Sequence, residues 1–116
     1  MRRFMGSFTE GVDFDTIARE WRCKWSVDDD KKSLAEAQKA LNEVLEEVKA
    51  VKGFKKVDRV VCGGCHDFKV ITSLPADDFG DWEASNFAPE ETFLKKLESI
   101  DGITTIETQT YTIMPM

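Results

Sequence analysis

The chain has 116 residues, of which 41% are hydrophobic and 33% are charged, and its formal net charge is −6. This length suits one domain with its own core rather than two. An acidic chain is repelled by a phosphate backbone, and no Lys/Arg-rich stripe offsets that repulsion, so we expect this chain alone to bind no nucleic acid. No apolar run is long enough to span a membrane, and no membrane association is expected.

The N-terminal region carries few structural signals. Residues 1–8 contain two arginines but no apolar stretch behind them, so they do not resemble a secretory signal. We therefore expect a cytoplasmic protein, in which the three cysteines are reduced. Residues 1–15 show no clear period and are interpreted as an N-terminal arm or extension, and residues 16–116 are expected to form a single domain.

The first strand and the first helix are indicated by their apolar periods. Residues 20–26 alternate in polarity, with Trp21, Cys23 and Trp25 on one face of a strand. Three aspartates follow at 28–30 and suit a helix N-terminus, and residues 33–36 match a capping box. A helical stripe with spacings of three and four then consists of Leu34, Ala37, Leu41, Val44, Leu45, Val48 and Val51, ended by Gly53.

The second half of the chain predicts three strands and one helix. Residues 57–62 and 68–74 are rich in β-branched residues and read as a pair of strands joined by a turn. Residues 75–88 are expected to be a loop that packs on the domain, because the loop carries three aromatic side chains. Pro89 is placed as the first residue of a helix that Gly102 stops, and residues 103–114 form the last strand.

The element order is strand, helix, strand, strand, helix, strand. This order consists of two strand–helix–strand halves joined by a hairpin. It predicts an α+β fold, a ferredoxin-like βαββαβ sandwich with a four-stranded antiparallel sheet and both helices on one face. The other face is left bare, so we expect a homodimer, or a ring of dimers, with sheets packed face to face. The candidate apolar side chains for this interface are some of Trp21, Trp25, Ile71, Tyr111 and Ile113.

Three segments resemble the ligand-binding domain of Lrp/AsnC-type regulators. Residues 97–108 (LESIDGITTIET) resemble its terminal "L-x-x-I-P-G-V-x-x-T-x-T", and residues 60–68 (VVCGGCHDF) resemble its central hairpin "G-x-x-D-[YF]". Residues 51–57 (VKGFKKV) resemble the start of its second strand. The chain departs from the pattern at Asp101 and Ile106, the segment 79–88 is longer, and no helix-turn-helix domain precedes residue 21.

The resemblance implies a stand-alone RAM-like domain within the dimeric α+β barrel superfamily. Such a domain is an oligomeric module that senses a small, amino-acid-like molecule and lacks its own DNA-binding domain. Residues matching the family motif imply that Gly64 and Asp67 contact the ligand, with Thr108 in support. Under this interpretation the chain is a binding protein rather than an enzyme, and no cofactor is expected.

The same superfamily contains small enzymes of the monooxygenase and cyclase type, which gives the alternative function. In that case His66, the single histidine of the chain, is the candidate general base, because histidine titrates near neutral pH. The sequence places no second acid, nucleophile or oxyanion donor beside it.

The stretch Cys62–Cys65–His66 offers a second alternative, a metal or redox site. Its C-x-x-C-H spacing is that of c-type haem attachment, but a second axial ligand would have to be a methionine. A zinc site would need a fourth ligand, for which Cys23 and Asp67 are candidates. A thioredoxin-type pair lies at a helix N-terminus, whereas a strand follows here. The remaining interpretation is a plain hairpin turn that contains two glycines.

Overall fold

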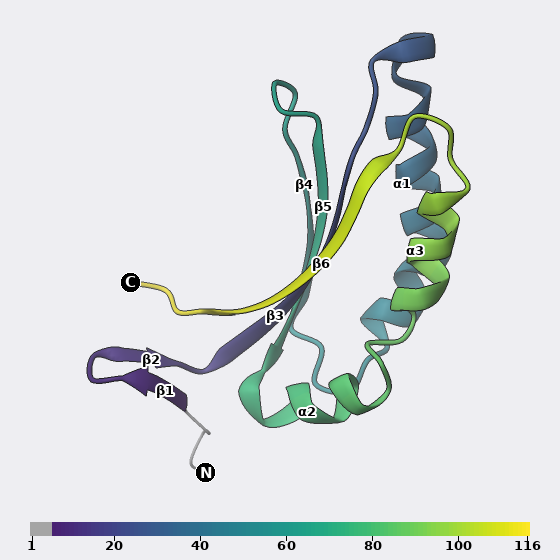
Figure 1. The fold of residues 1–116 in the computed structure, drawn as a ribbon. Coiled ribbons are helices and arrows are strands. Elements are labelled where there is room, and N and C mark those ends of the chain that lie inside the picture. Colours follow the sequence, from purple (N-terminus) through teal and green to yellow (C-terminus); the bar gives the residue numbers. More distant parts are fainter. Residues whose placement is uncertain (1–5) are drawn as a thin grey trace.

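The computed structural model describes residues 6–116, which form six strands and three helices (Figure 1). The elements are β1 (Gly6–Thr9), β2 (Val12–Phe14), β3 (Thr16–Lys24), α1 (Asp28–Lys49), β4 (Lys56–Val61), β5 (Asp67–Pro75), α2 (Ala76–Ala84), α3 (Glu90–Glu98) and β6 (Thr104–Ile113).

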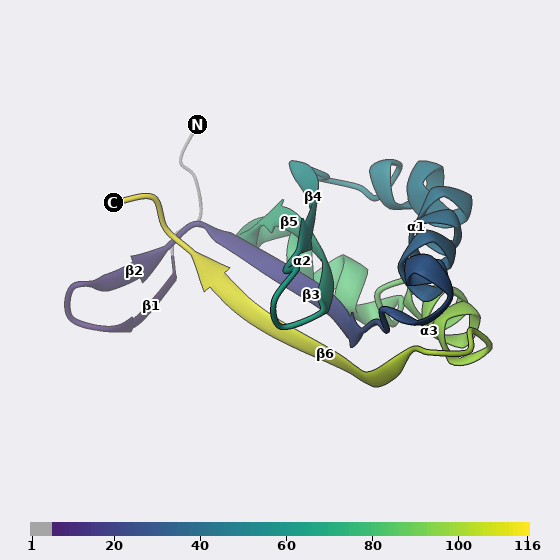
Figure 2. The ribbon, with the colours of Figure 1, turned by 90° about the horizontal axis from the view of Figure 1, so that it is seen from above.

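The main sheet has four antiparallel strands in the order β4-β5-β3-β6. Helices α1 and α3 cover one face of this sheet and leave the other face open (Figures 1 and 2). The predicted ferredoxin-like α+β fold is confirmed. We call the two sides of the sheet the helix face and the open face.

Strand register assigns each side chain to one of these faces. Trp21 pairs with Val70 on one side and with Thr108 on the other, and Cys23 pairs with Phe68, so all five point toward the helices. The apolar stripe of α1 packs on the helix face and completes the core, as the period of the stripe predicts. The buried members of that stripe are Ala37, Ala40, Leu41, Val44 and Val48.

The start of α1 differs from the prediction. Asp29, Asp30 and Lys31 have φ values of 53°, 56° and 62°, so they do not form a regular first turn. The capping box is also wrong: Ser33 is buried inside the helix, where its hydroxyl accepts the backbone N–H of Ser26 at 2.9 Å. The N-cap position belongs to Val27, which makes no side-chain capping bond.

The segment 75–88 is not a loop, because α2 occupies most of it. Phe79 and Trp82 are buried by this short helix, and their rings meet edge to face at 5.9 Å between centroids. Phe87 joins them, with its centroid 5.2 Å from that of Trp82. The expected packing of these aromatics is therefore confirmed. Pro89 precedes α3 as its N-cap rather than forming its first residue.

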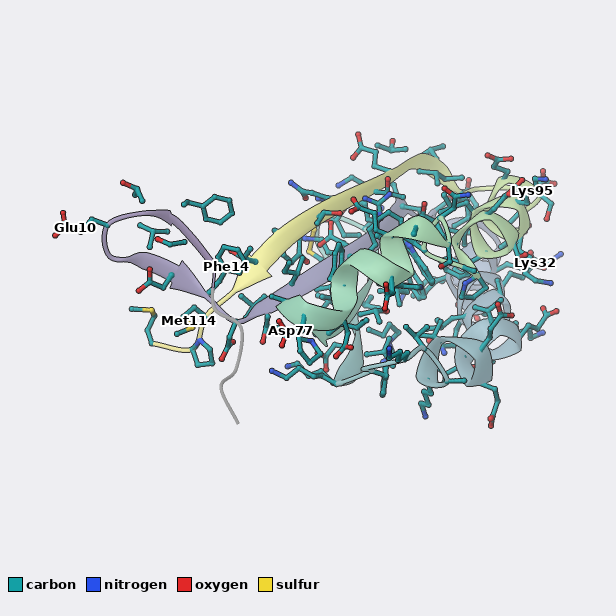
Figure 3. All side chains as sticks on the ribbon, turned by 90° about the horizontal axis from the view of Figure 1, so that it is seen from below. Glu10, Phe14, Lys32, Asp77, Lys95 and Met114 are labelled. Atoms are coloured by element: carbon teal, nitrogen blue, oxygen red, sulfur yellow. A yellow bond between two sulfur atoms is a disulfide. The ribbon has the colours of Figure 1, made fainter. Side chains whose placement is uncertain are left out.

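A small hairpin, β1–β2, forms the described part of the N-terminal arm. The hairpin turns at Gly11, whose φ of +81° favours glycine, and the rings of Phe8 and Phe14 lie 5.1 Å apart. The hairpin projects beyond the sheet, with Glu10 near its tip and Phe14 beside Met114 (Figure 3). Residues 1–5 of the expected arm lie outside the described residues.

The open face carries more charge than the dimer interface that the sequence predicts. Trp21 and Trp25 belong to the buried core under the helices, so only Ile71, Tyr111 and Ile113 remain as candidates for that interface. Charged side chains of β3 and β5 occupy the rest, namely Glu20, Arg22, Lys24, Asp67 and Lys69. Within residues 6–116, no helix combines the length and the hydropathy that crossing a membrane requires.

Candidate functional site

A polar cluster lies on the helix face, where β3 passes under the start of α3. Arg19 projects from β3, and its Nε donates to Oε1 of Glu90 at 2.8 Å, while Nη2 donates to Oε2 at 3.3 Å. Both side chains are about five-sixths buried, with 16% and 15% of their surface exposed. Such a two-point contact fixes the guanidinium and the carboxylate relative to each other.

Trp21 completes this cluster by donating to the same carboxylate. Its indole Nε1 lies 2.7 Å from Oε1 of Glu90, the atom that also accepts from Arg19. Two N–H donors from neighbouring positions on β3 thus converge on one anionic oxygen. The two bonds stabilise the ionised form of the Glu90 carboxylate.

Threonines of β6 hold Arg19 from the opposite side. The guanidinium donates to the hydroxyls of Thr108 and Thr110, each at 2.9 Å. Phe87 covers the guanidinium, with its ring centroid 4.1 Å away. The guanidinium is therefore oriented by partners on two elements, β6 and α3, besides the aromatic ring.

An unpaired hydroxyl faces the same layer. Thr72 lies opposite Arg19 in the β3–β5 ladder, is 1% exposed, and its Oγ1 has no hydrogen-bond partner among residues 6–116. Phe93 forms an apolar wall nearby, since its ring packs at a tilt against Trp21, with 5.2 Å between the ring centroids. A buried polar atom without a partner is costly in a core, which makes this position a candidate ligand contact.

A surface hollow approaches the cluster from the edge of the sheet. The hollow has a volume of about 460 Å³ and is lined by Arg22, Glu107, Thr108 and Gln109. Thr108 both lines this hollow and accepts a hydrogen bond from Arg19. The other three lining residues point to the open face, so Thr108 is the contact between this hollow and the cluster.

A second polar arrangement runs along the open face. Tyr111 donates to Glu20 at 2.9 Å, Arg22 bridges Glu20 and Asp67 at 3.4 Å each, and Lys24 contacts Asp67 at 2.7 Å. The hydrogen bond from Lys24 holds the pKa of the Asp67 carboxyl below its usual value, and burial works against this shift. Burial raises the pKa of Tyr111, and the bond to Glu20 adds to the rise.

The structure does not bring Gly64, Asp67 and Thr108 together within one chain. Asp67 pairs with Lys24 in the sheet and lies on the open face, whereas Thr108 pairs with Trp21 and points to the helix face. Gly64 is in the exposed turn, where a Cβ would meet no atom within 4 Å. Asp67 already has two cationic partners, so an ammonium ligand would have to displace them.

His66 lies outside the Arg19 cluster. Its ring stacks on Trp25 at 4.5 Å, at the far end of β3. Trp25 is six residues beyond Arg19, which corresponds to about 20 Å along an extended strand. The structure therefore does not place His66 as a base beside these donors.

The cysteines differ from their predicted reduced state. Cys62 and Cys65 are joined by a disulfide across the hairpin turn, with 5.6 Å between their Cα atoms. Burial raises the pKa of the free thiol of Cys23 to about 11, and the carboxylate of Asp67 adds to this. Among the residues that the structure describes, no three His, Cys, Asp or Glu side chains are grouped as a metal site would require.

The residues of the helix-face cluster were not predicted as a site. Arg19 precedes the segment in which the alternation was recognised, although it continues the same phase as Trp21, Cys23 and Trp25. Glu90 lies in the first turn of α3, where acidic residues are common and indicate no site by themselves. The sequence did contain one signal for this site: a charged residue occupies a core-facing position of the strand. A charged side chain that is buried there needs a partner of opposite charge.

Comparisons with known proteins give structural relatives only. No protein-family model matches the sequence, and no curated protein is significantly similar to it. A candidate antibiotic biosynthesis monooxygenase from Deinococcus radiodurans superposes with a TM-score of 0.64 at 11% identity, over 86% of this chain and 94% of that one. A conserved protein from Methanosarcina mazei gives 0.62 at 13% identity, over 85% and 93%.

A third solved structure carries a biochemical description. SnoaB, a cofactor-independent oxygenase from Streptomyces nogalater, superposes with a TM-score of 0.57 at 15% identity, over 88% of this chain and 96% of that one. These likenesses cover nearly whole chains and therefore establish the fold, while their low identities carry no function across. The chain thus shares a ferredoxin-like α+β architecture with these proteins.

Proposed function

We propose that the chain is a small oxygenase-type enzyme of the dimeric α+β barrel class, which acts on an aromatic, polyketide-like substrate without a cofactor. The observation that carries the proposal is the convergence of Arg19 and Trp21 on one anionic oxygen of Glu90. The structural relatives support the same class, since one is described as a monooxygenase candidate and another as a cofactor-independent oxygenase.

Each member of the cluster has a role in this proposal. Glu90 accepts a proton from an acidic hydroxyl or methylene group of the substrate. The neutralised Glu90 then releases the N–H donors of Arg19 and Trp21, which stabilise the oxyanion that results. The electron-rich anion then reduces O₂ directly, so that a CH₂ group and O₂ give a carbonyl group and water. Thr72 supplies a hydroxyl for a polar substituent, and the rings of Phe87 and Phe93 provide apolar walls.

The proposal is tested by O₂ uptake with hydroxylated tricyclic aromatics that contain an activated methylene group, in the presence of a metal chelator. The intact protein is expected to consume O₂ and to form one carbonyl product per O₂. Arg19→Met and Glu90→Gln are each expected to lower the rate at least about a hundredfold, the usual loss for a stabilising donor or a general base.

Glu91→Gln is the matched control for Glu90→Gln. Glu91 lies next in the chain but pairs with Lys95 on the exposed surface, where the two side chains keep 80% and 70% of their surface. This variant should retain full activity. Binding of aromatics without any turnover would contradict the oxygenase and favour the ligand-sensing module instead. A stabilisation by free amino acids would point to that module as well.

We also propose that the protein is a homodimer that pairs through the open face. The support is the chain of paired charges on that face, in which the carboxylates of Glu20 and Asp67 are buried while Arg22 and Lys24 keep 28% and 40% of their side-chain surface. A second sheet would complete their burial and the shape of the fold class. Native mass spectrometry is expected to show an even-numbered assembly, and a monomer at micromolar concentration would contradict it.

A further inference from the structure

The tip of the β4–β5 hairpin holds a cysteine pair that the proposed oxygenase chemistry does not use. The disulfide between Cys62 and Cys65 closes a loop with only two glycines inside it. Cys65 is exposed and Cys62 is half-buried, so the bond lies at the protein surface. We propose that this pair is a thiol–disulfide exchange site that reacts with low-molecular-weight disulfides of the glutathione type.

Structural stabilisation is a weak reason for this bond. A disulfide removes little entropy from the unfolded chain when its loop is so short. The hairpin is also held without it, because the backbone N–H of Cys62 donates to the carbonyl of Asp67 at 3.0 Å and the β4–β5 ladder continues from Val61 and Phe68. Reduction therefore leaves the turn folded, as reversible exchange requires.

The surroundings of the two sulfur atoms differ. The backbone N–H of Cys65 donates to Sγ of Cys62 at 3.0 Å, and such a bond stabilises a thiolate at Cys62. Sγ of Cys65 lies 3.3 Å from Oδ2 of Asp67, whose negative charge disfavours a thiolate there. The geometry makes Cys62 the attacking thiol and Cys65 the resolving one.

The exchange has two balanced steps. The Cys62 thiolate attacks one sulfur of the small disulfide RSSR, forms a mixed disulfide and releases RS⁻, which takes up a proton. Cys65 then loses its proton to the neighbouring carboxylate or to water and attacks the Cys62 sulfur, which forms the protein disulfide and releases a second RS⁻. In total, two protein thiols are oxidised and one RSSR is reduced to two RSH.

Trp25 lies where it reports this change. Its ring stacks on His66, its backbone N–H donates to the carbonyl of His66 at 3.0 Å, and its indole N–H donates to the carbonyl of Asp67 at 3.2 Å. These partners directly follow Cys65 in the chain. A change in the turn upon reduction is therefore expected to alter the fluorescence of Trp25.

The test equilibrates the full-length protein in glutathione buffers of varied ratio, starting from oxidised and from reduced protein. Thiols are trapped by alkylation, and the intact mass gives the fraction of each form. A tenfold change in [GSH]²/[GSSG] should change the dithiol-to-disulfide ratio about tenfold, along one curve from both directions. A pair that stays oxidised, or stays reduced, at every ratio would overturn the proposal.

Three sets of variants make the result specific. Cys65→Ser should form a stable glutathione adduct at least about tenfold faster than Cys62→Ser, and the reverse order would overturn the assignment of the attacking thiol. Cys23→Ala should leave the titration unchanged, because Cys23 is buried. Trp25→Phe should abolish the fluorescence response but keep the mass titration, whereas an unchanged response would overturn the role of Trp25. None of these readouts depends on oxygenase activity.

Discussion

Arg19 and Glu90 are 71 residues apart in sequence, yet they form a two-point ion pair under the helices. The pair joins the central strand β3 to the start of α3, and it receives a third bond from Trp21. A buried ion pair of this kind rarely stabilises a fold more than apolar side chains of similar size do. Its presence in the core is therefore better explained by a function than by stability.

The first prediction concerns the energetic coupling of this pair. Arg19→Met leaves the Glu90 carboxylate buried without its cationic partner, and the free energy of unfolding should fall by about 3 kcal/mol. Glu90→Leu should lower the free energy of unfolding by a similar amount, because it leaves the Arg19 guanidinium buried without its anionic partner. The double variant should recover most of the loss, because no charge is then left unpaired. Urea denaturation of the four proteins measures the cycle.

Lys96→Met and Glu43→Leu form the matched control cycle. Lys96 of α3 and Glu43 of α1 also form an ion pair between two elements, at 3.0 Å, but they are more exposed, at 33% and 59%. Their coupling should lie below about 1 kcal/mol. Purely additive losses for Arg19 and Glu90 would show that the pair is not a coupled unit.

Local periodicity was sufficient to predict most of the fold. The alternation around Trp21 and the helical stripe of α1 follow from burial on one face, which is a property of neighbouring residues. Helix α2 escaped prediction because Asp77, Asp78 and Gly80 are poor helix formers, and its helical signal is only the spacing between Phe79 and Trp82. Burial of those rings overrides the weak local preference.

The candidate site was less accessible from sequence than the fold. Arg19 and Glu90 belong to different halves of the chain, and no spacing rule connects them. The motif-based candidates are not brought together within one chain, for a related reason: Asp67 and Thr108 lie on strands whose register places them on opposite faces. That register is set by tertiary packing, and a match to a short motif does not contain it.

The second prediction compares two phenylalanines in different environments. Phe79 is 4% exposed and packs against Trp82 and Phe87, so Phe79→Ala should cost about 3–5 kcal/mol of unfolding free energy. Phe8 is 68% exposed on the projecting hairpin, and Phe8→Ala should cost less than about 0.5 kcal/mol. Thermal unfolding followed by circular dichroism measures both. Equal losses would contradict the assignment of α2 to the core.

The third prediction concerns the reactivity of Cys23. With a pKa of about 11, on the order of one in a thousand of these thiols is ionised at pH 8. In reduced native protein, a thiol reagent should therefore modify Cys62 and Cys65 rapidly and Cys23 only after unfolding. Intact mass at successive times counts the modified thiols. Rapid labelling of a native Cys62→Ser/Cys65→Ser variant would contradict the burial of Cys23.

The raised pKa of Cys23 also gives a direction for stability at alkaline pH. Above its ordinary value of 9.0, the thiol ionises in the unfolded chain but stays protonated in the folded protein. The unfolded state then holds fewer protons, so stability falls as pH rises from about 9 to 11. Cys23→Ala should reduce this alkaline loss, and an unchanged slope between the two proteins would be the contrary result.

The last prediction concerns acid stability through Asp67. Its pKa is lowered, first by the hydrogen bond from Lys24 and then by the charges of Lys24 and Arg22, so the folded state binds fewer protons than the unfolded state in acid. The stabilisation is present above the usual pKa of an aspartate and is lost as pH falls through the lowered value. Asp67→Asn should therefore lower the stability of the protein at pH 6 and flatten the decline in stability below about pH 4.

Asp58→Asn is the matched control, because Asp58 pairs with Lys56 at 3.3 Å with 49% of its side chain exposed. The stability of this variant should depend on pH as that of the intact protein does. If Asp67→Asn instead loses stability in acid along the same curve, then the ion chain of the open face does not anchor the sheet, and the acid sensitivity belongs to other carboxylates.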